Sequence, residues 1–277
     1  MGAGGPVSSR IKRRSQRARQ EVKLYIEDHG KGSAVVLIHG MPSTTKFFAS
    51  AVETLSRAHR VLVPELPGYG RTPPIDRGYT FPLVQAMLED DLLRRGITRP
   101  VVVGYSGGAY RALALAFSSR VAVAGVVSLA GLAGLDPEAR AGFRAQAGLL
   151  RRDGVGDFRA SWLARMAAPG FANGHPAEAE DILSWLDCTS ARSLAEELDA
   201  IASAEDLRPL LAGLKVPVLA IAGALDAAVP CGWSEAIASA VPNGELRVVP
   251  GCGHALLYED PLETTEALRR FVERATS

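Results

Sequence analysis

The chain has 277 residues, of which 47% are apolar and 22% charged, as in soluble globular proteins. This length is near the upper end of what one hydrophobic core supports, so we expect one domain with a sizeable insertion. Apolar runs such as PVLAIAGAL are too short to span a membrane, and no membrane span is expected. The 3 cysteines are widely spaced and lack a C-x-x-C pair, so we expect neither a disulfide framework nor a metal site.

Charge is unevenly distributed. The first twenty residues hold six basic side chains and no acidic one, and removing these six from the net charge of +1 leaves −5 for the rest. The body therefore offers no basic surface to nucleic acid, and no nucleic-acid partner is expected. We interpret residues 1–20 as a disordered basic tail, with a tether to a membrane surface or nucleic acid as the alternative. No apolar segment follows Arg13 and Arg14, so no export signal is complete and we expect a cytoplasmic protein.

Short apolar runs alternate with segments of helical periodicity along the chain. We expect an initial pair of strands over residues 21–33, ending in a glycine-rich turn. Further strands are predicted over 34–40, 59–66, 100–106, 121–131, 217–223 and 246–251, and helices over 46–58, 82–95, 108–118, 231–240 and 261–275. Runs that are apolar without alternation suit strands buried on both faces. The pattern predicts an α/β fold with a mostly parallel sheet covered by helices on both faces.

Residues 133–204 break this alternation, because they contain no convincing strand and show helical spacing of apolar residues. Asp136 before Pro137 is typical of a helix N-cap followed by proline at the first helical position. We interpret 133–204 as a helical cap inserted between the two parts of an α/β core, 21–132 and 205–277. Five large apolar residues of the cap suit its own core, with a substrate-pocket wall as the alternative: Phe158, Trp162, Met166, Phe171 and Trp185.

The stretch VVVGYSGGAY places Ser106 between glycines, directly after a predicted strand and before a predicted helix. Glycines on both sides permit a sharp turn at which strand and helix approach closely. A serine held there exposes its hydroxyl beside the positive end of the helix. We therefore predict Ser106 as a nucleophile, with a plain strand-to-helix turn as the alternative.

A serine hydroxyl needs a base, and the base needs an acid to orient it. His254 in GCGHALL follows the last predicted strand, and Asp226 in GALDAAVP follows the strand before it. Carboxyl ends of parallel strands share one edge of a sheet, so these side chains should reach the edge that carries Ser106. We predict His254 as the base and Asp226 as the acid, with Asp136 in reserve. The chain order of serine, aspartate and histidine matches one known triad order.

Acyl transfer also needs donors for the developing oxyanion. The segment LIHGMP ends a predicted strand, so the backbone amide of Met41 could face that of Gly107 across the site. An ordinary tight turn at Pro42 is the alternative.

Together these motifs resemble the α/β-hydrolase fold superfamily over residues 22–275. The matching segments are HGMP, PELPGYGRTPP, GYSGG, GALDAAVP and GCGHALLYEDP. The resemblance implies that Ser106, Asp226 and His254 form the triad and that the amides of Met41 and Gly107 form the oxyanion hole. A serine nucleophile is unlike the aspartate of haloalkane dehalogenases and epoxide hydrolases, and the carboxy-terminal half is similar to enol-lactonases and small esterases. One departure is Glu65, where many relatives carry aspartate.

This resemblance implies a serine hydrolase that cleaves a carboxylic ester or lactone of a small molecule through an acyl-serine intermediate. No cofactor is expected. Two alternatives on the same triad are a carbon–carbon bond hydrolase and a cofactor-free perhydrolase. A third is a non-catalytic protein that uses the fold to bind a ligand.

Overall fold

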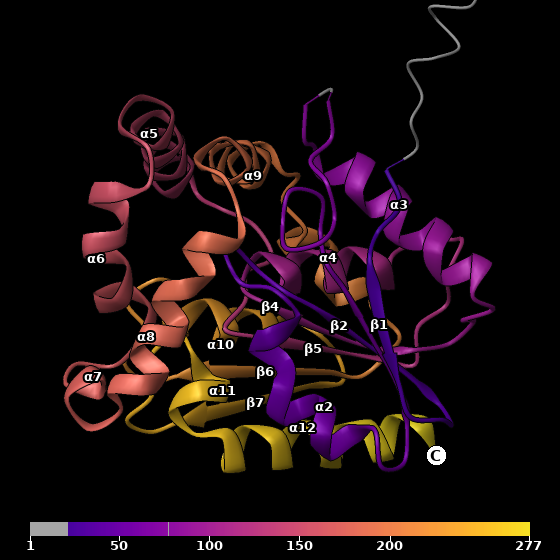
Figure 1. Ribbon diagram of the computed structural model, residues 1–277. Coiled ribbons are helices and arrows are strands. Elements are labelled where there is room, and N and C mark those ends of the chain that lie inside the picture. Colours follow the sequence, from indigo (N-terminus) through magenta and orange to yellow (C-terminus); the bar gives the residue numbers. More distant parts are fainter. Residues whose placement is uncertain (1–21, 77) are drawn as a thin grey trace, which may run out of the picture.

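The computed structural model describes residues 22–76 and 78–277 (Figure 1). The basic tail predicted over residues 1–20 lies outside the described residues. The described strands form one sheet in the order β1-β3-β2-β4-β5-β6-β7, in which β1 is antiparallel to β3 and the other neighbours are parallel. The strands are β1 (Ile26–His29), β2 (Ala34–Ile38), β3 (Arg60–Pro64), β4 (Val101–Tyr105), β5 (Gly125–Leu129), β6 (Val218–Gly223) and β7 (Gly244–Val249).

The middle of the sheet is apolar on both faces. Every residue of β4, β5 and β6 is buried, as expected of strands that lack a polar face. The strand β4 pairs with β2 on one side and β5 on the other, so the carboxyl end of β4 lies at the centre of the sheet edge. The predicted α/β class and the mostly parallel sheet are therefore confirmed.

The predicted pair of strands over residues 21–33 is wrong, because the described part of this segment holds only β1. Residues 22–25 form no strand, and β1 is the outermost strand of the sheet, paired only with β3. Gly30 and Gly32 instead have φ values of 69° and 111° and turn the chain from β1 into β2. A side chain at Gly30 would meet the carbonyl oxygen of His59 at 2.3 Å, so this turn requires glycine.

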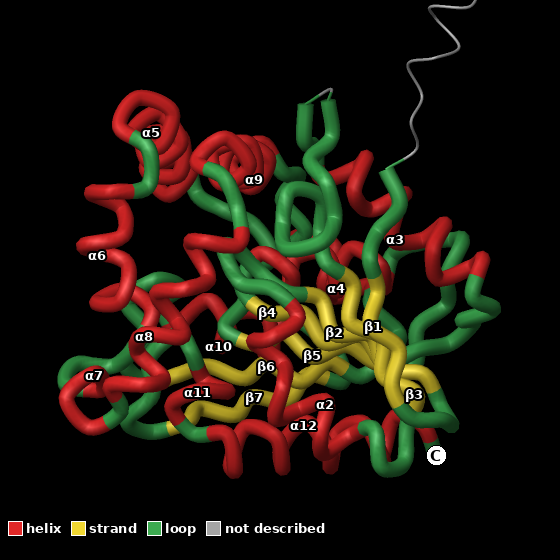
Figure 2. The backbone as a smooth tube through the Cα atoms, in the orientation of Figure 1, coloured by secondary structure: helices red, strands yellow, loops and turns green. Residues whose placement is uncertain are grey.

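Helices cover both faces of the sheet (Figure 2). The helices α2 and α12, which contact each other, lie on one face, and α3, α4 and α10 lie on the other (Figure 1). These helices and the short 3₁₀ turns beside them are η1 (Thr45–Phe48), α2 (Ala49–Leu55), α3 (Phe81–Arg94), α4 (Gly107–Ala116), η3 (Arg208–Gly213), α10 (Cys231–Ala240), α11 (Leu256–Glu259) and α12 (Pro261–Thr276).

The remaining helices form an insertion between β5 and β6. They are α5 (Pro137–Asp153), α6 (Gly156–Met166), α7 (Phe171–Gly174), α8 (Pro176–Ser184), the 3₁₀ turn η2 (Trp185–Cys188) and α9 (Ala191–Ser203). The helices α5 and α9 pack along each other. In Figure 1, α7 and α8 lie beyond the arrowheads of β6 and β7, at the carboxyl edge of the sheet. Among the described helices, none is long and apolar enough to cross a membrane.

Candidate active site

Ser106 joins β4 to α4 with a backbone φ of 54°, a value that residues other than glycine rarely adopt. The turn is tight, because a Cβ at Gly104 or at Gly108 would lie 2.2 Å from a backbone oxygen. Such strain persists only where the surrounding structure enforces it, and it gathers at functional sites. The Ser106 side chain is half-buried and its hydroxyl makes no hydrogen bond to another described residue. It is therefore free to bond a molecule in the site.

His254 and Asp226 lie in direct contact, in the loops that follow β7 and β6. The Nδ1–H of His254 donates to Oδ2 of Asp226 at 2.7 Å, and the two side chains are 2% and 0% exposed. The other carboxylate oxygen accepts from the amides of Ala228 and Val229, both at 2.8 Å, which fixes the orientation of Asp226. Because Nδ1 carries the proton shared with Asp226, Nε2 is the basic nitrogen of the neutral imidazole.

Tyr105 brings this pair to the end of β4, the strand that leads into Ser106. It directly precedes Ser106, and its ring centroid lies 5.0 Å from that of His254. Tyr105 stacks in turn on Phe47, with ring centroids 3.7 Å apart. Burial raises the pKa of Tyr105 well above its ordinary value, so the ring serves as a neutral packing surface between Phe47 and His254.

The segments that carry the two predicted oxyanion donors meet at Ser106. A Cβ built on Gly40 would lie 2.7 Å from the Cβ of Ser106 and 3.3 Å from the nitrogen of Gly107, so Gly40 packs against both residues. Met41 follows Gly40 in the chain and is buried. Gly107 begins α4, where the first amides of a helix have no partner within the helix and face the positive end of its dipole. This arrangement can stabilise negative charge next to Ser106.

Comparison with known proteins identifies the family of the chain. A family model described as the alpha/beta hydrolase family matches residues 35–268. The chain belongs to this family. RutD of Yersinia enterocolitica, which is named as a carbamate hydrolase, is 28% identical over 247 residues, covering 84% of this chain and 86% of the relative.

Solved structures of other alpha/beta hydrolases have the same fold. A thermophilic esterase from Thermogutta terrifontis, with malate bound, gives a TM-score of 0.86 at 29% identity, covering 92% of this chain and 94% of that one. Est816, described as an N-acyl homoserine lactone degrading enzyme, gives a TM-score of 0.78 at 22% identity, covering 92% and 98% of the two chains. The second likeness is one of fold alone. The family model, RutD and the Thermogutta terrifontis esterase support hydrolase activity.

His39 has a supporting place in this alpha/beta hydrolase. Its Nδ1–H donates to the carbonyl oxygen of Gly40 at 3.0 Å, and its Nε2 accepts from the amide of Leu66 at 2.9 Å. Complete burial lowers the pKa of His39 to about 4, so the ring is neutral at pH 7. Both nitrogens of His39 are used in joining the end of β2 to the loop after β3.

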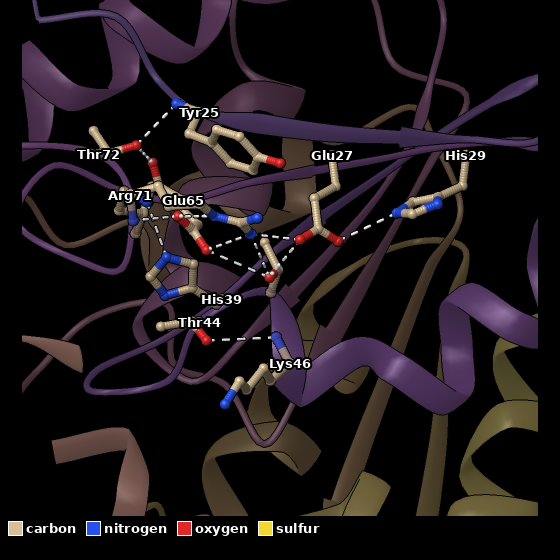
Figure 3. Close-up of polar contacts among 11 residues, drawn as sticks. Tyr25, Glu27, His29, His39, Thr44, Lys46, Glu65, Arg71 and Thr72 are labelled. Carbon is tan, nitrogen blue, oxygen red and sulfur yellow. Dashed lines mark hydrogen bonds and ion pairs between the residues drawn. The ribbon is translucent and has the colours of Figure 1, made fainter. Parts of the chain in front are cut away.

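Figure 3 shows a polar cluster that holds the loop after β3, with Arg71 between the carboxylates of Glu65 and Glu27. Glu65, the departure from the family pattern, is 2% exposed and accepts from Arg71 Nη2 at 2.9 Å. Thr72 donates to the carbonyl of Glu65 at 2.7 Å and accepts from the amide of Tyr25 at 2.9 Å. The pKa of Arg71 is raised, chiefly by its bond to Glu65. Glu65, which is longer than the aspartate of many relatives, thus has its carboxylate paired with Arg71.

Sequence reasoning missed a buried ion pair between core and insertion. Arg111 of α4 and Glu197 of α9 are both 0% exposed, with Arg111 Nη2 3.8 Å from Glu197 Oε1. Arg111 also donates to the hydroxyl of Tyr79 at 2.6 Å. Burial raises the pKa of Glu197, while Arg111 opposes that rise. Each charge sits in a helix of ordinary composition, so only the packing of the two helices identifies the pair.

The large apolar residues of the insertion pack among themselves and against the core. Trp162, Met166 and Trp185 are buried, and Phe158 stacks on Trp162 with ring centroids 5.0 Å apart. Phe171 packs at the edge of the same core. Asp136, the reserve acid, caps α5, where its carboxylate accepts from the amide of Ala139 at 2.8 Å. Within residues 22–76 and 78–277, no group of histidine, cysteine and acidic side chains is arranged to hold a metal ion.

Proposed function

We propose that this alpha/beta hydrolase cleaves a carboxylic ester or lactone of a small molecule through an acyl-serine intermediate. Two observations support this most strongly: the 2.7 Å hydrogen bond between His254 and Asp226, and a serine held at positive φ on the neighbouring strand end. A ligand-binding protein would need neither the strained serine nor the oriented imidazole.

In the proposed reaction, Nε2 of His254 takes the hydroxyl proton of Ser106 as the serine oxygen attacks the substrate carbonyl carbon. Asp226 stabilises the imidazolium that forms, and the amides of Met41 and Gly107 bind the oxyanion. The intermediate collapses to an acyl-serine, and His254 returns the proton to the departing alcohol oxygen. Water, deprotonated by His254, then releases the acid and restores Ser106. None of these steps uses a cofactor.

The helical insertion, residues 133–204, is in our proposal the cap that shapes the acyl pocket. The end of α6 contacts the loop between β7 and α11 that carries His254, which we call the histidine loop. There the amide of Ala255 donates to the carbonyl of Met166, the last residue of α6, at 2.7 Å. Acyl length would therefore be selected by side chains of the insertion, whereas the chemistry resides in the sheet edge.

Carbamate cleavage is a second candidate, favoured by the RutD relative of Yersinia enterocolitica. It would use the same three side chains, because a carbamate also presents a carbonyl carbon to the serine. The two substrates differ in what stays on the enzyme: an acyl group from an ester, and a carbamoyl group from an aryl carbamate.

The test is the Ser106→Ala variant, assayed on p-nitrophenyl esters of increasing acyl length, on lactones and on p-nitrophenyl carbamates. We expect at least a ~10⁴-fold loss of turnover on the true substrate class. Ser203→Ala, at an exposed serine of α9, is the matched control and should keep full activity. Unchanged turnover in Ser106→Ala would exclude the serine mechanism. Failure of a fluorophosphonate to label the wild-type protein would favour the ligand-binding alternative.

A further inference from the structure

Glu259 makes an unusual set of contacts around the histidine loop. It ends α11, five residues after His254, and its carboxylate accepts three backbone amides. Oε2 accepts from Gly253 at 2.9 Å and from Ala168 at 2.7 Å, and Oε1 accepts from Ala255 at 3.1 Å. Two of these donors are the amides on either side of His254.

The third donor, Ala168, belongs to the insertion. The segment after α6 passes directly against the histidine loop, because a Cβ at Gly253 would lie 2.7 Å from the nitrogen of Ala168 and 2.8 Å from the carbonyl carbon of Ala167. Only glycine permits this approach. One carboxylate thus joins the loop that carries His254 to the helical insertion.

Among the described residues, the amides of Gly253 and Ala168 bond only to Glu259, whereas the amide of Ala255 also donates to the carbonyl of Met166 at 2.7 Å. The histidine loop has left the sheet, so no neighbouring strand accepts from it, and an unpaired buried amide is costly. Hydrogen bonds to a charged acceptor are roughly twice as strong as bonds between neutral groups. Glu259 lies near Asp226, and the pKa of Glu259 is raised by burial and by that second carboxylate, whereas the three amides oppose the rise. The three amide bonds are thus the contacts that favour the ionised form, against the effect of burial.

We infer that Glu259 is a positioning residue for His254: by holding both flanking amides it keeps Nδ1 of the imidazole on Asp226, and through Ala168 it makes that placement depend on the docked insertion. The catalytic consequence rests on the proposed function. The placement of the imidazole does not, since the contacts exist whatever the substrate is.

The variant Glu259→Gln separates the effect of the carboxylate's hydrogen bonds from the effect of the side chain's volume. Glutamine keeps the shape but replaces one acceptor oxygen with an NH₂ group, which must then face a backbone N–H. With the NH₂ group at the Oε1 position, Ala255 loses its bond to residue 259 and keeps only the carbonyl of Met166, while Gly253 and Ala168 bond to a neutral oxygen in place of a charged one. Glu273→Gln, at a glutamate of α12 that pairs with Arg269, is the matched control.

The first measurement is the downfield proton resonance of the His254 Nδ1–H, recorded by ¹H NMR and assigned by its loss in Asp226→Asn. We expect it in wild type and in Glu273→Gln, and expect it broadened or lost in Glu259→Gln. An unchanged resonance in Glu259→Gln overturns the inference. This readout needs no substrate, so it stands even if Ser106→Ala shows that the proposed function is wrong.

The second measurement is steady-state kinetics with p-nitrophenyl acetate. We expect kcat of Glu259→Gln to fall at least ~10-fold with KM within about twofold, because a misplaced base slows chemistry more than binding. Glu259→Asp restores the charge but is one methylene shorter, so it should recover part of kcat; it also serves if the glutamine variant does not fold. A lower melting temperature with the resonance and kcat both unchanged would show a merely structural role and overturn the inference.

Discussion

Burial of His39 should make the protein lose stability between pH 6.5 and about 4. In the folded protein the pKa of His39 is lowered to about 4 from an ordinary 6.5. The cause is complete burial, and Nε2 cannot take a proton without losing the bond it accepts from the amide of Leu66. Between the two pH values the unfolded chain binds a proton at this side chain and the folded chain does not.

The sign and size of the effect follow from this difference. Proton uptake by the unfolded state alone lowers the free energy of unfolding as the pH falls, at about 1.4 kcal/mol per pH unit. From pH 6.5 to about 4 this amounts to about 3 kcal/mol. The contribution of His39 is complete above pH 6.5 and is lost once the pH falls to its folded pKa.

The assay compares wild type with His39→Gln by urea denaturation, followed by circular dichroism, from about pH 7 down to about pH 4.5. The variant should be less stable at pH 7, and the gap between the two proteins should narrow by most of the ~3 kcal/mol as the pH falls. Carboxylates titrate in both proteins, so they cancel in this gap. A His175→Gln control, at an exposed histidine, corrects for the removal of one imidazole. A gap that stays constant with pH would refute the reasoning.

Two further substitutions test other contacts. Arg111→Met should destabilise the protein by about 3–5 kcal/mol in urea denaturation, because it leaves Glu197 buried without its cation. Adding Glu197→Leu should recover most of that loss. If stability does not recover in the double variant, the two side chains are not coupled. Asp136→Ala should lower the free energy of unfolding by about 1 kcal/mol, because it removes the N-cap of α5. Turnover on the best ester should stay within about twofold of wild type. A large loss of turnover there would instead make Asp136 the acid of the triad.

The sequence predicted the strands and helices well where local pattern determines them. The runs that become β2 to β6 are apolar except for Arg60 and Ser128, and burial on both faces leaves that composition little freedom. The strand β1 was harder, because its partner β3 lies more than thirty residues along the chain. Nothing in residues 21–33 reveals which sheet edge is free, so the predicted pairing within that segment failed.

The candidate site was predictable to the extent that it follows from the sheet. The rule that carboxyl ends of parallel strands share one edge places Asp226 and His254 together, and the structure has their side chains hydrogen-bonded at 2.7 Å. Their catalytic roles stay a prediction. Glu259 and Glu197 were not predictable, because each acts on a segment remote in sequence, Ala168 and Arg111 respectively. An acidic residue five positions after a loop histidine indicates no role by itself, because its contact with Ala168 exists only in the folded protein.

The candidate site depends on side chains that bind backbone, and this has a physical reason. At the carboxyl edge the chain leaves its strands and loses ladder partners, yet its amides remain buried and must be paired. His39 pairs the amide of Leu66, Asp226 pairs two amides and Glu259 pairs three. These bonds position the loops of the site and contribute little to core packing. Substitutions of these three side chains should therefore lower kcat by larger factors than their effect on the free energy of unfolding suggests. Core substitutions of equal cost, remote from this edge, should leave kcat nearly unchanged.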